Sequence, residues 1–282
     1  MYNIIQKRKI WLTLSNFMAG LSIVAIIIWG LNFGIDFTGG SLLEVKFLEN
    51  RPTVDEVQKK LADLELGSLI VQQVDEDGMI LRFQDTSEKK HQEIVSRLAN
   101  VNQTELSGVE ELRFDSVGPS IGQELKRKSI AAITIVLIAI VLYIAWAFRK
   151  VSKPVVSWKY GLTAVITLFH DVVIVVGVFA VLGKFAGIEI NTAFVAAVLT
   201  VLGYSVNDTI VVFDRIRENL PRSDEDFENT INISVNQTLR RSINTSITTL
   251  LVLLSVFFFG GSSIRDFVLA LSIGVFIGTY SS

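Results

Sequence analysis

The sequence predicts a polytopic α-helical membrane protein with six transmembrane helices and a small ferredoxin-like α+β domain between the first and second helices. Half of the 282 residues are hydrophobic, the mean hydropathy is +0.48, and only 19% are charged, against about 25% in soluble domains. The charged residues lie in blocks between uncharged stretches of about 20 residues, long enough to cross a bilayer core of about 30 Å. Residues 34–125 hold 18 of the 28 acidic residues. A purely soluble protein is therefore excluded, and an acidic domain outside the membrane is expected.

Six segments are apolar enough to be membrane-spanning helices. Five of them have the required length, about 20 residues: 10–35, 129–148, 160–183, 190–213 and 242–264. The sixth begins at Phe267 and reaches Ser282 after 16 residues, so we expect the chain to stop inside a helix that a longer polypeptide would complete. The predicted divisions are residues 1–35 with the first helix, the outer domain 36–125, and residues 126–282 with the remaining helices.

The distribution of positive charge predicts a cytoplasmic N-terminus. The first apolar run is too long for a signal peptide and lacks a small-residue cleavage pattern, so it is expected to be an uncleaved anchor. Only Lys184 and Arg265 lie on short outer connections, as the positive-inside rule requires; the cluster 126–128 is an exception, but it follows a long translocated loop, where the rule is weak. The short cytoplasmic segments carry Lys7, Arg8, Lys9, Arg149, Lys150, Lys153, Lys159, Arg215, Arg217, Arg222, Arg240 and Arg241.

The segment between the first two spans has the pattern of a split βαβ domain. Strand-like runs occur at 41–48, 69–74, 79–83 and 109–117, and helical patterns at 54–64 and 88–99. Thr53 and Glu56 form a capping-box signature, and residues 75–78, Asp-Glu-Asp-Gly, form a turn. The order β-α-β-β-α-β is ferredoxin-like, a fold that implies no particular activity. We expect His91, on the polar side of the second helix, to be a solvated surface residue.

The composition also limits the chemistry. There is no cysteine, and the two histidines, His91 and His170, cannot form a zinc site unaided. Gly177 to Lys184 resembles a phosphate-binding loop only superficially, because Phe185 stands where Ser or Thr is needed. Basic residues flank apolar segments instead of alternating with aromatic ones, which argues against nucleic acid. We therefore expect no metal, no cofactor and no bond-making chemistry.

Ionisable groups within the spans are the candidate functional residues, because a charge in the membrane interior is costly. Asp208 lies inside the fourth span on a stripe with Ala193, Ala197, Thr200 and Tyr204, and a stripe of small and polar residues is expected to face other helices. Arg241 opens the fifth span near the same membrane face, and Thr245, Thr248 and Ser255 are expected to continue its stripe. Asp171 and His170 lie in the middle of the third span. Each group either carries protons or simply hydrogen-bonds neighbouring helices together.

Two further patterns predict helix packing. Phe227, Ile231, Val235 and Leu239 repeat every four residues after an acidic helix start, which predicts an amphipathic helix over 223–240 on the cytoplasmic surface. Gly274 and Gly278 form a G-x-x-x-G motif typical of helix contacts in membranes.

Several motifs resemble those of the SecD/SecF family of bacterial protein-export membrane proteins, which is related to the RND transporters, and in particular its smaller, SecF-type subunits. The resemblance extends from the first span to the end of the chain. The motifs are Gly34-Ile-Asp-Phe-Thr-Gly-Gly40, Ser116-Val-Gly-Pro-Ser-Ile-Gly122, His170-Asp171-Val, Gly203-Tyr-Ser-Val-Asn-Asp208-Thr-Ile-Val-Val, Phe213-Asp-Arg-Ile-Arg-Glu-Asn219, Asn236-Gln-Thr-Leu-Arg-Arg-Ser-Ile-Asn-Thr-Ser246 and Phe259-Gly-Gly261.

The resemblance implies an RND-like half with six spans and an auxiliary role in export across the bacterial inner membrane. It implies pairing with SecD beside the SecYEG channel, contact with exported polypeptides, YajC and YidC as further partners, and a proton gradient as the energy source, although sodium coupling stays open. The family's coupling carboxylate corresponds to Asp208 and its arginine to Arg241. Asp171, His170 and Asn207 are either relay or packing residues. The alternatives are a proton-driven exporter of small molecules or lipids and a non-transporting scaffold of the translocon.

Overall fold

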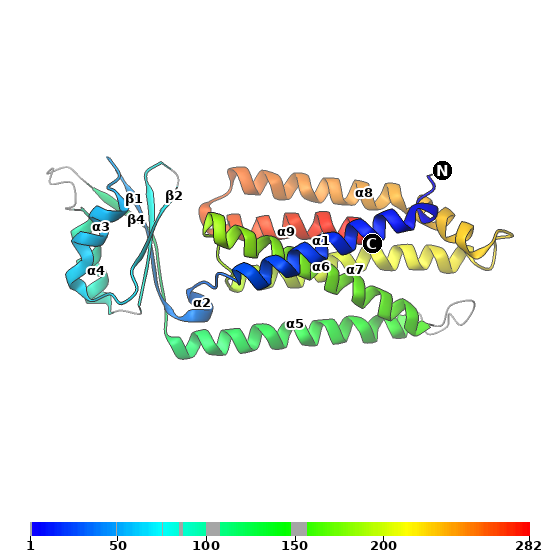
Figure 1. Cartoon of the computed structure of the whole chain (residues 1–282), viewed down its shortest axis with the longest axis horizontal. Helices are drawn as coiled ribbons and strands as arrows, with labels where there is room; N and C mark the ends of the chain where they lie inside the picture. Colours follow the sequence, from blue (N-terminus) through cyan, green and yellow to red (C-terminus); the bar gives the residue numbers. More distant parts are fainter. Residues whose placement is uncertain (1, 49, 75, 85–86, 100–107, 148–156) are drawn as a thin grey trace. The chain divides into compact units, whose positions relative to one another are not determined.

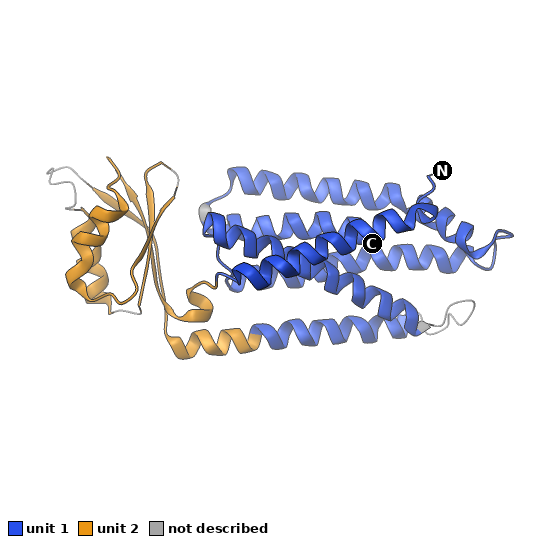
Figure 2. Cartoon of the chain, in the orientation of Figure 1, with its two compact units in different colours: residues 1–32, 129–282 blue, residues 33–128 orange. Residues whose placement is uncertain are grey.

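The chain folds into two compact units, shown in a computed structural model (Figures 1 and 2). One unit comprises residues 1–32 and 129–282, and the other residues 33–128. The structure describes residues 2–48, 50–74, 76–84, 87–99, 108–147 and 157–282. The boundaries expected from the sequence, after residues 35 and 125, lie three residues from those of the structure. Asp75 of the predicted turn and the predicted cytoplasmic cations Arg149, Lys150 and Lys153 lie outside the described residues.

Within the residues that the structure describes, six helices are long and apolar enough to cross a membrane, which confirms the predicted number. The first ends at Trp29, not at residue 35, because Gly30 adopts a φ of 69° that favours glycine and ends the helix. The fifth ends at Phe259, and the sixth begins at Ser262. The sixth therefore has 20 residues, and the prediction that it is too short to span is wrong. The helices are α1 (Arg8–Trp29), α5 (Pro119–Ala147), α6 (Ser157–Ala186), α7 (Thr192–Asn219), α8 (Phe227–Phe259) and α9 (Ser262–Ser281).

Small residues set the closest helix contacts. In the larger unit, α6 packs against α1, and α7 packs against both α8 and α9. A Cβ atom added at Gly177 of α6 would lie 2.3 Å from the Cβ of Ser22 on α1, and one at Gly274 of α9 would lie 2.1 Å from a methyl group of Val201 on α7. Such distances are far below van der Waals contact. Glycine at these two positions therefore lets the backbones approach, as expected for helices in a membrane.

Helix α8 is continuous over 33 residues, so the separate surface helix predicted over 223–240 does not form. Its N-cap is Asp226, whose side chain accepts a hydrogen bond from the backbone N–H of Asn229. The apolar repeat does not form the buried face either, since Phe227 is exposed and the other three residues of the repeat are only half-buried. The prediction failed because small polar groups make the packing face of this helix. Its buried residues are Thr230, Asn232, Ser234, Thr238, Ser242 and Ser246.

The beginning of the chain is bound to this polar stretch of α8. Asn236 accepts a hydrogen bond from the backbone N–H of Tyr2 (2.7 Å) and donates one to the Tyr2 carbonyl (2.8 Å). Asn232 accepts from the backbone N–H groups of Ile4 and Ile5 (3.0 and 3.2 Å). These bonds attach residues 2–5, just before α1, to α8.

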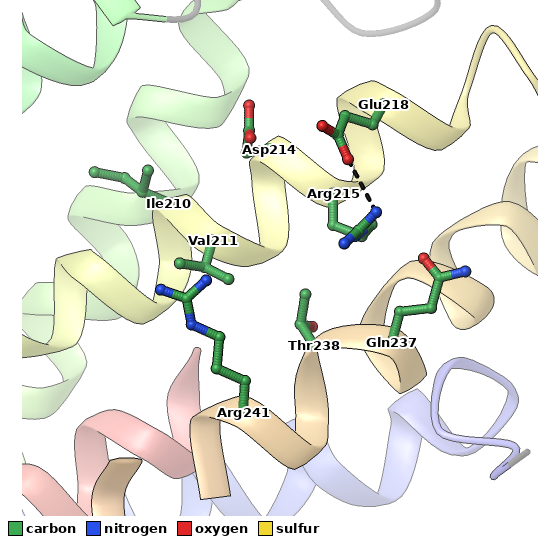
Figure 3. A pocket seen from close by; sticks show the side chains of 8 residues that line it. All are labelled: Ile210, Val211, Asp214, Arg215, Glu218, Gln237, Thr238 and Arg241. Carbon is green, nitrogen blue, oxygen red and sulfur yellow. Dashed lines mark hydrogen bonds and ion pairs between the residues drawn. The ribbon is translucent and has the colours of Figure 1, made fainter. Parts of the chain in front are cut away.

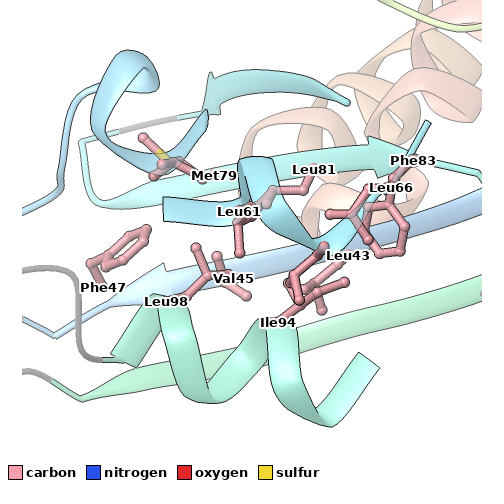
Figure 4. Packing of buried hydrophobic residues seen from close by; sticks show 12 residues of the cluster. Leu43, Val45, Phe47, Leu61, Leu66, Met79, Leu81, Phe83, Ile94 and Leu98 are labelled. Atoms are coloured by element: carbon pink, nitrogen blue, oxygen red, sulfur yellow. The ribbon is translucent and has the colours of Figure 1, made fainter. Parts of the chain in front are cut away.

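The smaller unit has the predicted β-α-β-β-α-β order. Its antiparallel sheet has the strand order β2-β3-β1-β4, and inward residues alternate along β1 and β3 as a half-buried sheet requires. Figure 4 shows these side chains packed against α3 and α4, with Leu43, Leu81 and Ile94 fully buried at the centre. The elements are α2 (Ile35–Thr38), β1 (Gly40–Phe47), α3 (Val54–Leu61), β2 (Ile70–Val74), β3 (Gly78–Phe83), α4 (Glu88–Ala99) and β4 (Val109–Val117).

Two consecutive glycines start the sheet. Gly39 and Gly40 have φ values of 75° and 125°, a region that side-chain-bearing residues rarely adopt. A Cβ at Gly39 would lie 2.8 Å from the Cα of Pro119, and one at Gly40 would lie 2.8 Å from the carbonyl oxygen of Phe83. Both backbone angle and space therefore require glycine at these positions.

His91 is buried, and the prediction of a solvated histidine is wrong. Its ring stacks on Phe114 of β4, with the ring centroids 3.8 Å apart. Nε2 lies 3.0 Å from a carboxylate oxygen of Glu111, and Nδ1 lies 3.3 Å from one of Glu88. The apparently polar side of α4 is covered because β4, far along the chain, supplies both an aromatic ring and a carboxylate.

Candidate functional site

Asp208 is a buried carboxylate on α7 with one unsatisfied oxygen. Only 6% of the residue is exposed, and Oδ2 has no hydrogen-bond partner among the described residues. The helix that positions it is capped at its start by Asn191, which accepts a hydrogen bond from the backbone N–H of Phe194. An unpaired buried polar atom is rare in folded proteins and calls for a physical reason. The unpaired oxygen would be explained if the carboxyl group takes up a proton, or if it binds a partner that moves away.

Arg241 lies on α8 at a pocket of about 260 Å³ between α7 and α8. The side chain extends from α8 toward Val211 of α7 (Figure 3). The two acidic residues at the pocket already have cationic partners: Asp214 pairs with Arg217 at 2.7 Å, and Glu218 pairs with Arg215 at 3.0 Å. Within the described part of the chain, Arg241 has no ion pair. The pocket is lined by Ile210, Val211, Asp214, Arg215, Glu218, Gln237, Thr238 and Arg241.

The structure brings Asp208 and Arg241 into one neighbourhood but not into direct contact. Asp208 interacts with the side chain of Ser242 and with the charge of Arg241, yet no ion pair within 4.0 Å joins the two among the described residues. A guanidinium that acts on a carboxylate without binding it can engage or withdraw through a small helix movement.

A second buried carboxylate, Asp171, lies at the centre of a network that joins four helices. The residue is fully buried. Its Oδ2 accepts hydrogen bonds from the hydroxyl groups of Ser205 on α7 (2.6 Å) and Ser281 on α9 (2.9 Å), and its Oδ1 lies 3.0 Å from Nδ1 of His170. Nε2 of His170 lies 2.6 Å from the hydroxyl oxygen of Ser15 on α1.

The predicted stripes are only partly correct. On α7, Ala197 is buried but Thr200 is exposed, while Tyr204 donates or accepts a hydrogen bond with Ser246 of α8 at 3.1 Å. Asn207 is exposed. On α8, Arg241 is itself exposed, and the three residues predicted to continue its stripe share that exposed face; the buried face is one position further along, at Ser242 and Ser246. The exposed three are Thr245, Thr248 and Ser255.

The glycine motif of α9 contributes to the Asp171 network through packing. Gly274 and Gly278 both face α7, where an added Cβ would meet Val201 and Ser205 respectively, the latter at 3.0 Å. This close contact places Ser281 within hydrogen-bonding distance of Asp171. The predicted packing role of Gly274 and Gly278 agrees with these distances.

Ser15, Ser205 and Ser281 were not singled out from the sequence. Each is a small polar residue in an apolar helix, which is a weak signal because such residues are common at helix contacts in membranes. They lie 155, 34 and 110 residues from their partners. Their convergence depends on the packing of four helices, which no local pattern contains.

These features define a class of protein. The six apolar helices and the buried ionisable groups are those of a multi-pass membrane protein with a polar interior, and buried ionisable groups in such proteins mark ion or substrate pathways. Residues 97–282 match the family described as protein export membrane protein SecD/SecF, C-terminal, and residues 24–47 match the SecD/SecF GG motif, which includes Gly39 and Gly40. The chain belongs to the SecD/SecF family.

Relatives of known name support the same family. The chain is 42% identical to the protein translocase subunit SecF of Thermobaculum terrenum, with 100% of this chain and 90% of the relative covered. It is 41% identical to the protein translocase subunit SecF of Magnetococcus marinus, with 100% and 88% covered. These names describe subunits of a protein-transport system, so the family has a transport role.

A solved structure has the same fold. The crystal structure of SecDF, a translocon-associated membrane protein from Thermus thermophilus, superimposes with a TM-score of 0.85 at 33% identity. SecDF in its super-membrane-facing form superimposes with a TM-score of 0.67, also at 33% identity. In both cases the match covers 99% of this chain but only 37% of the SecDF chain. The chain thus spans a little over a third of the solved protein.

Proposed function

We propose that this chain is an auxiliary subunit of the Sec translocase that pairs with SecD and couples proton flow to late steps of polypeptide export. The names of its relatives and the SecDF fold support a translocase subunit. The single observation on which the coupling rests is the buried Oδ2 of Asp208, which is unsatisfied among the described residues, near Arg241, which has no ion pair among them. We further propose the bacterial inner membrane as its location, with the N-terminus in the cytoplasm and residues 36–125 outside, next to the SecYEG channel.

In this mechanism, Asp208 alternates between charged and neutral forms. When it is ionised, the positive charge of Arg241 attracts it across the α7–α8 contact. When it takes up a proton from the outer side, that attraction is lost and the contact relaxes. Proton release to the cytoplasmic side restores it, so each cycle shifts α8 relative to α7.

The energy of one proton is too small to drive the cycle to completion. Moving one elementary charge through 100 mV supplies about 2.3 kcal/mol. Converting a 1:99 equilibrium between two conformations into 99:1 requires about 5.5 kcal/mol. We therefore infer that more than one proton moves in each cycle, or that a pH difference adds to the membrane potential.

The test is gradient-stimulated export in vesicles that contain the chain, SecD and SecYEG. Asp208→Asn keeps the size of the side chain but cannot ionise, so the gradient-stimulated part of export should be lost while assembly with SecD is retained. Asp214→Asn is the matched control, because Asp214 lies on the same helix and already pairs with Arg217. Normal stimulation in the Asp208→Asn vesicles would contradict the mechanism. A chain that acts only as a scaffold predicts no gradient dependence and no effect of Asp208→Asn, whereas an exporter of small molecules predicts gradient-dependent efflux without SecYEG.

A further inference from the structure

The network around Asp171 fixes the carboxylate as a hydrogen-bond acceptor. Ser205 donates its hydroxyl hydrogen to Oδ2 at 2.6 Å. Ser281 lies 2.9 Å from the same oxygen and 3.1 Å from the carbonyl oxygen of Gly278, and its one hydroxyl hydrogen is shared between these two acceptors. The remaining oxygen, Oδ1, is 3.0 Å from Nδ1 of His170. With hydroxyl groups at Oδ2 and the His170 ring at Oδ1, both oxygens of this fully buried carboxyl group have hydrogen-bond partners.

This arrangement also fixes the tautomer of His170. Because Oδ1 of Asp171 accepts, Nδ1 of the ring must carry the hydrogen. In the neutral imidazole the other nitrogen, Nε2, then has a free lone pair. Ser15 lies 2.6 Å from Nε2, so its hydroxyl group donates to that lone pair. A carboxylate that orients a histidine in this way leaves the opposite ring nitrogen basic.

We propose that Nε2 of His170 is a second proton-binding site, separate from Asp208 and located at the contact between α1 and α6. On proton uptake a new N–H bond forms at Nε2 and the ring becomes a cation beside the Asp171 carboxylate. Ser15 then changes from donor to acceptor, so the hydrogen bond between α1 and α6 reverses without being lost. The inference rests on the proposed proton coupling, for which a single proton supplies too little energy.

The charged surroundings of His170 are simple. Helix α1 has no charged residue after Lys9, and α9 has none after Asp266. Tyr280 of α9 has its hydroxyl group bonded to the carbonyl of Trp11 on α1. On α7, Asp208 lies three residues beyond Ser205, and Tyr204 is bonded to Ser246 of α8. Of the described charged groups, Asp171 is thus the one in contact with the ring.

The test is solid-state ¹⁵N NMR of the full chain in lipid bilayers with labelled histidine. The chain has only two histidines, so His91→Gln assigns both sets of signals. We expect the neutral His170 ring to carry its hydrogen on Nδ1 and to convert reversibly to the imidazolium form when it takes up a proton. A ring with its hydrogen on Nε2, or one charge state throughout, would overturn the proposal.

Two variants separate a proton site from a structural role. Asp171→Asn should shift the neutral ring toward the Nε2–H tautomer, as happens when the aspartate of such a pair is replaced, while the His91 signals stay unchanged. Ser15→Ala should keep the Nδ1–H tautomer, and it serves as the second variant if Asp171→Asn does not fold. Tautomer populations that are the same in Asp171→Asn and the parent chain would refute the role assigned to Asp171.

Export assays distinguish this proposal from the coupling at Asp208. His170→Gln should lose the gradient-stimulated part of export and retain the gradient-independent part. If Asp208→Asn abolishes stimulation and His170→Gln does not, His170 is not a coupling site and this proposal fails while the proposed function stands. If both variants are stimulated normally, the proposed function itself fails.

Discussion

The contact between Gly274 and Val201 gives a sharp prediction for the packing of α9 on α7. Gly274→Ala introduces a Cβ only 2.1 Å from one methyl carbon of Val201 and 2.7 Å from the other, whereas carbon atoms in contact lie about 3.5 Å apart. Val201 is buried, and a β-branched side chain in a helix has essentially one rotamer. It therefore cannot turn aside, and the two helices must separate by roughly 1 Å.

The expected cost follows from this overlap. Overpacking of a well-filled interior destabilises by about 1–3 kcal/mol, and the higher helix propensity of alanine offsets up to about 1 kcal/mol of that. Gly203→Ala on α7 is the matched control, because nothing lies within 4 Å of the added Cβ there. Gly203→Ala gains the same helix propensity as Gly274→Ala but introduces no steric overlap. Gly278→Ala, with its nearest contact at 3.0 Å, should fall between the two.

Reversible unfolding in mixed detergent micelles measures these differences. The free energy of unfolding should decrease in the order Gly203→Ala, Gly278→Ala, Gly274→Ala. Adding Val201→Ala to Gly274→Ala removes the two colliding methyl groups, so the double mutant should show a favourable coupling energy of about 0.5–3 kcal/mol. If Gly274→Ala is as stable as Gly203→Ala, or if the coupling energy is zero, the inferred contact between α7 and α9 is incorrect.

Three further predictions concern the smaller unit and the start of the chain. Thr53→Ala removes the N-cap of α3, so amides 54–61 should exchange roughly fivefold faster, equivalent to about 1 kcal/mol, whereas Thr53→Ser should not change them. The hydrogen bond from Arg97 lowers the pKa of Asp63 below its ordinary value. The stabilisation by this bond is therefore present above the unfolded pKa and is lost as the pH falls through the folded pKa. Hydrogen exchange of α4 should then accelerate at acid pH in the parent chain, and a similar acceleration in Asp63→Asn would refute this. Asn236→Ala breaks two hydrogen bonds to Tyr2. The chain has no cysteine, so Tyr2→Cys introduces a single thiol, which should react faster with maleimide when Asn236→Ala is also present. Equal rates would show that Asn236 does not hold residues 2–5.

The sequence was most informative where structure depends on neighbouring residues. The capping box of Thr53 and Glu56 forms as predicted, with both reciprocal hydrogen bonds, because its partners are three residues apart. The strand and helix order of the smaller unit was also predictable, since the hydrophobic period changes at each boundary. The tight contact made by Gly274 follows from a motif only five residues long.

The errors arose where distant residues decide the environment. The solvent exposure of His91 was predicted from the pattern of its own helix alone, but Phe114 and Glu111 of β4 cover the side chain. The apolar repeat that begins at Phe227 predicted a surface helix because the polar side of that helix was assumed to face water. In a helix bundle within a membrane, small polar side chains pack between helices and larger apolar ones face outward, which reverses the rule for soluble helices.

Helix α8 has no break between its two ends, so a tilt would move it as one rod. Its 33 residues extend for about 50 Å, and Arg241 lies roughly 21 Å from the Phe227 end and 27 Å from the Phe259 end at the same rise. A tilt of about 5° pivoting at Arg241 would therefore displace both ends by about 2 Å in opposite directions. Residues 2–5 are bonded to Asn232 and Asn236, which lie between Phe227 and Arg241. A tilt of α8 would therefore also displace the residues just before α1.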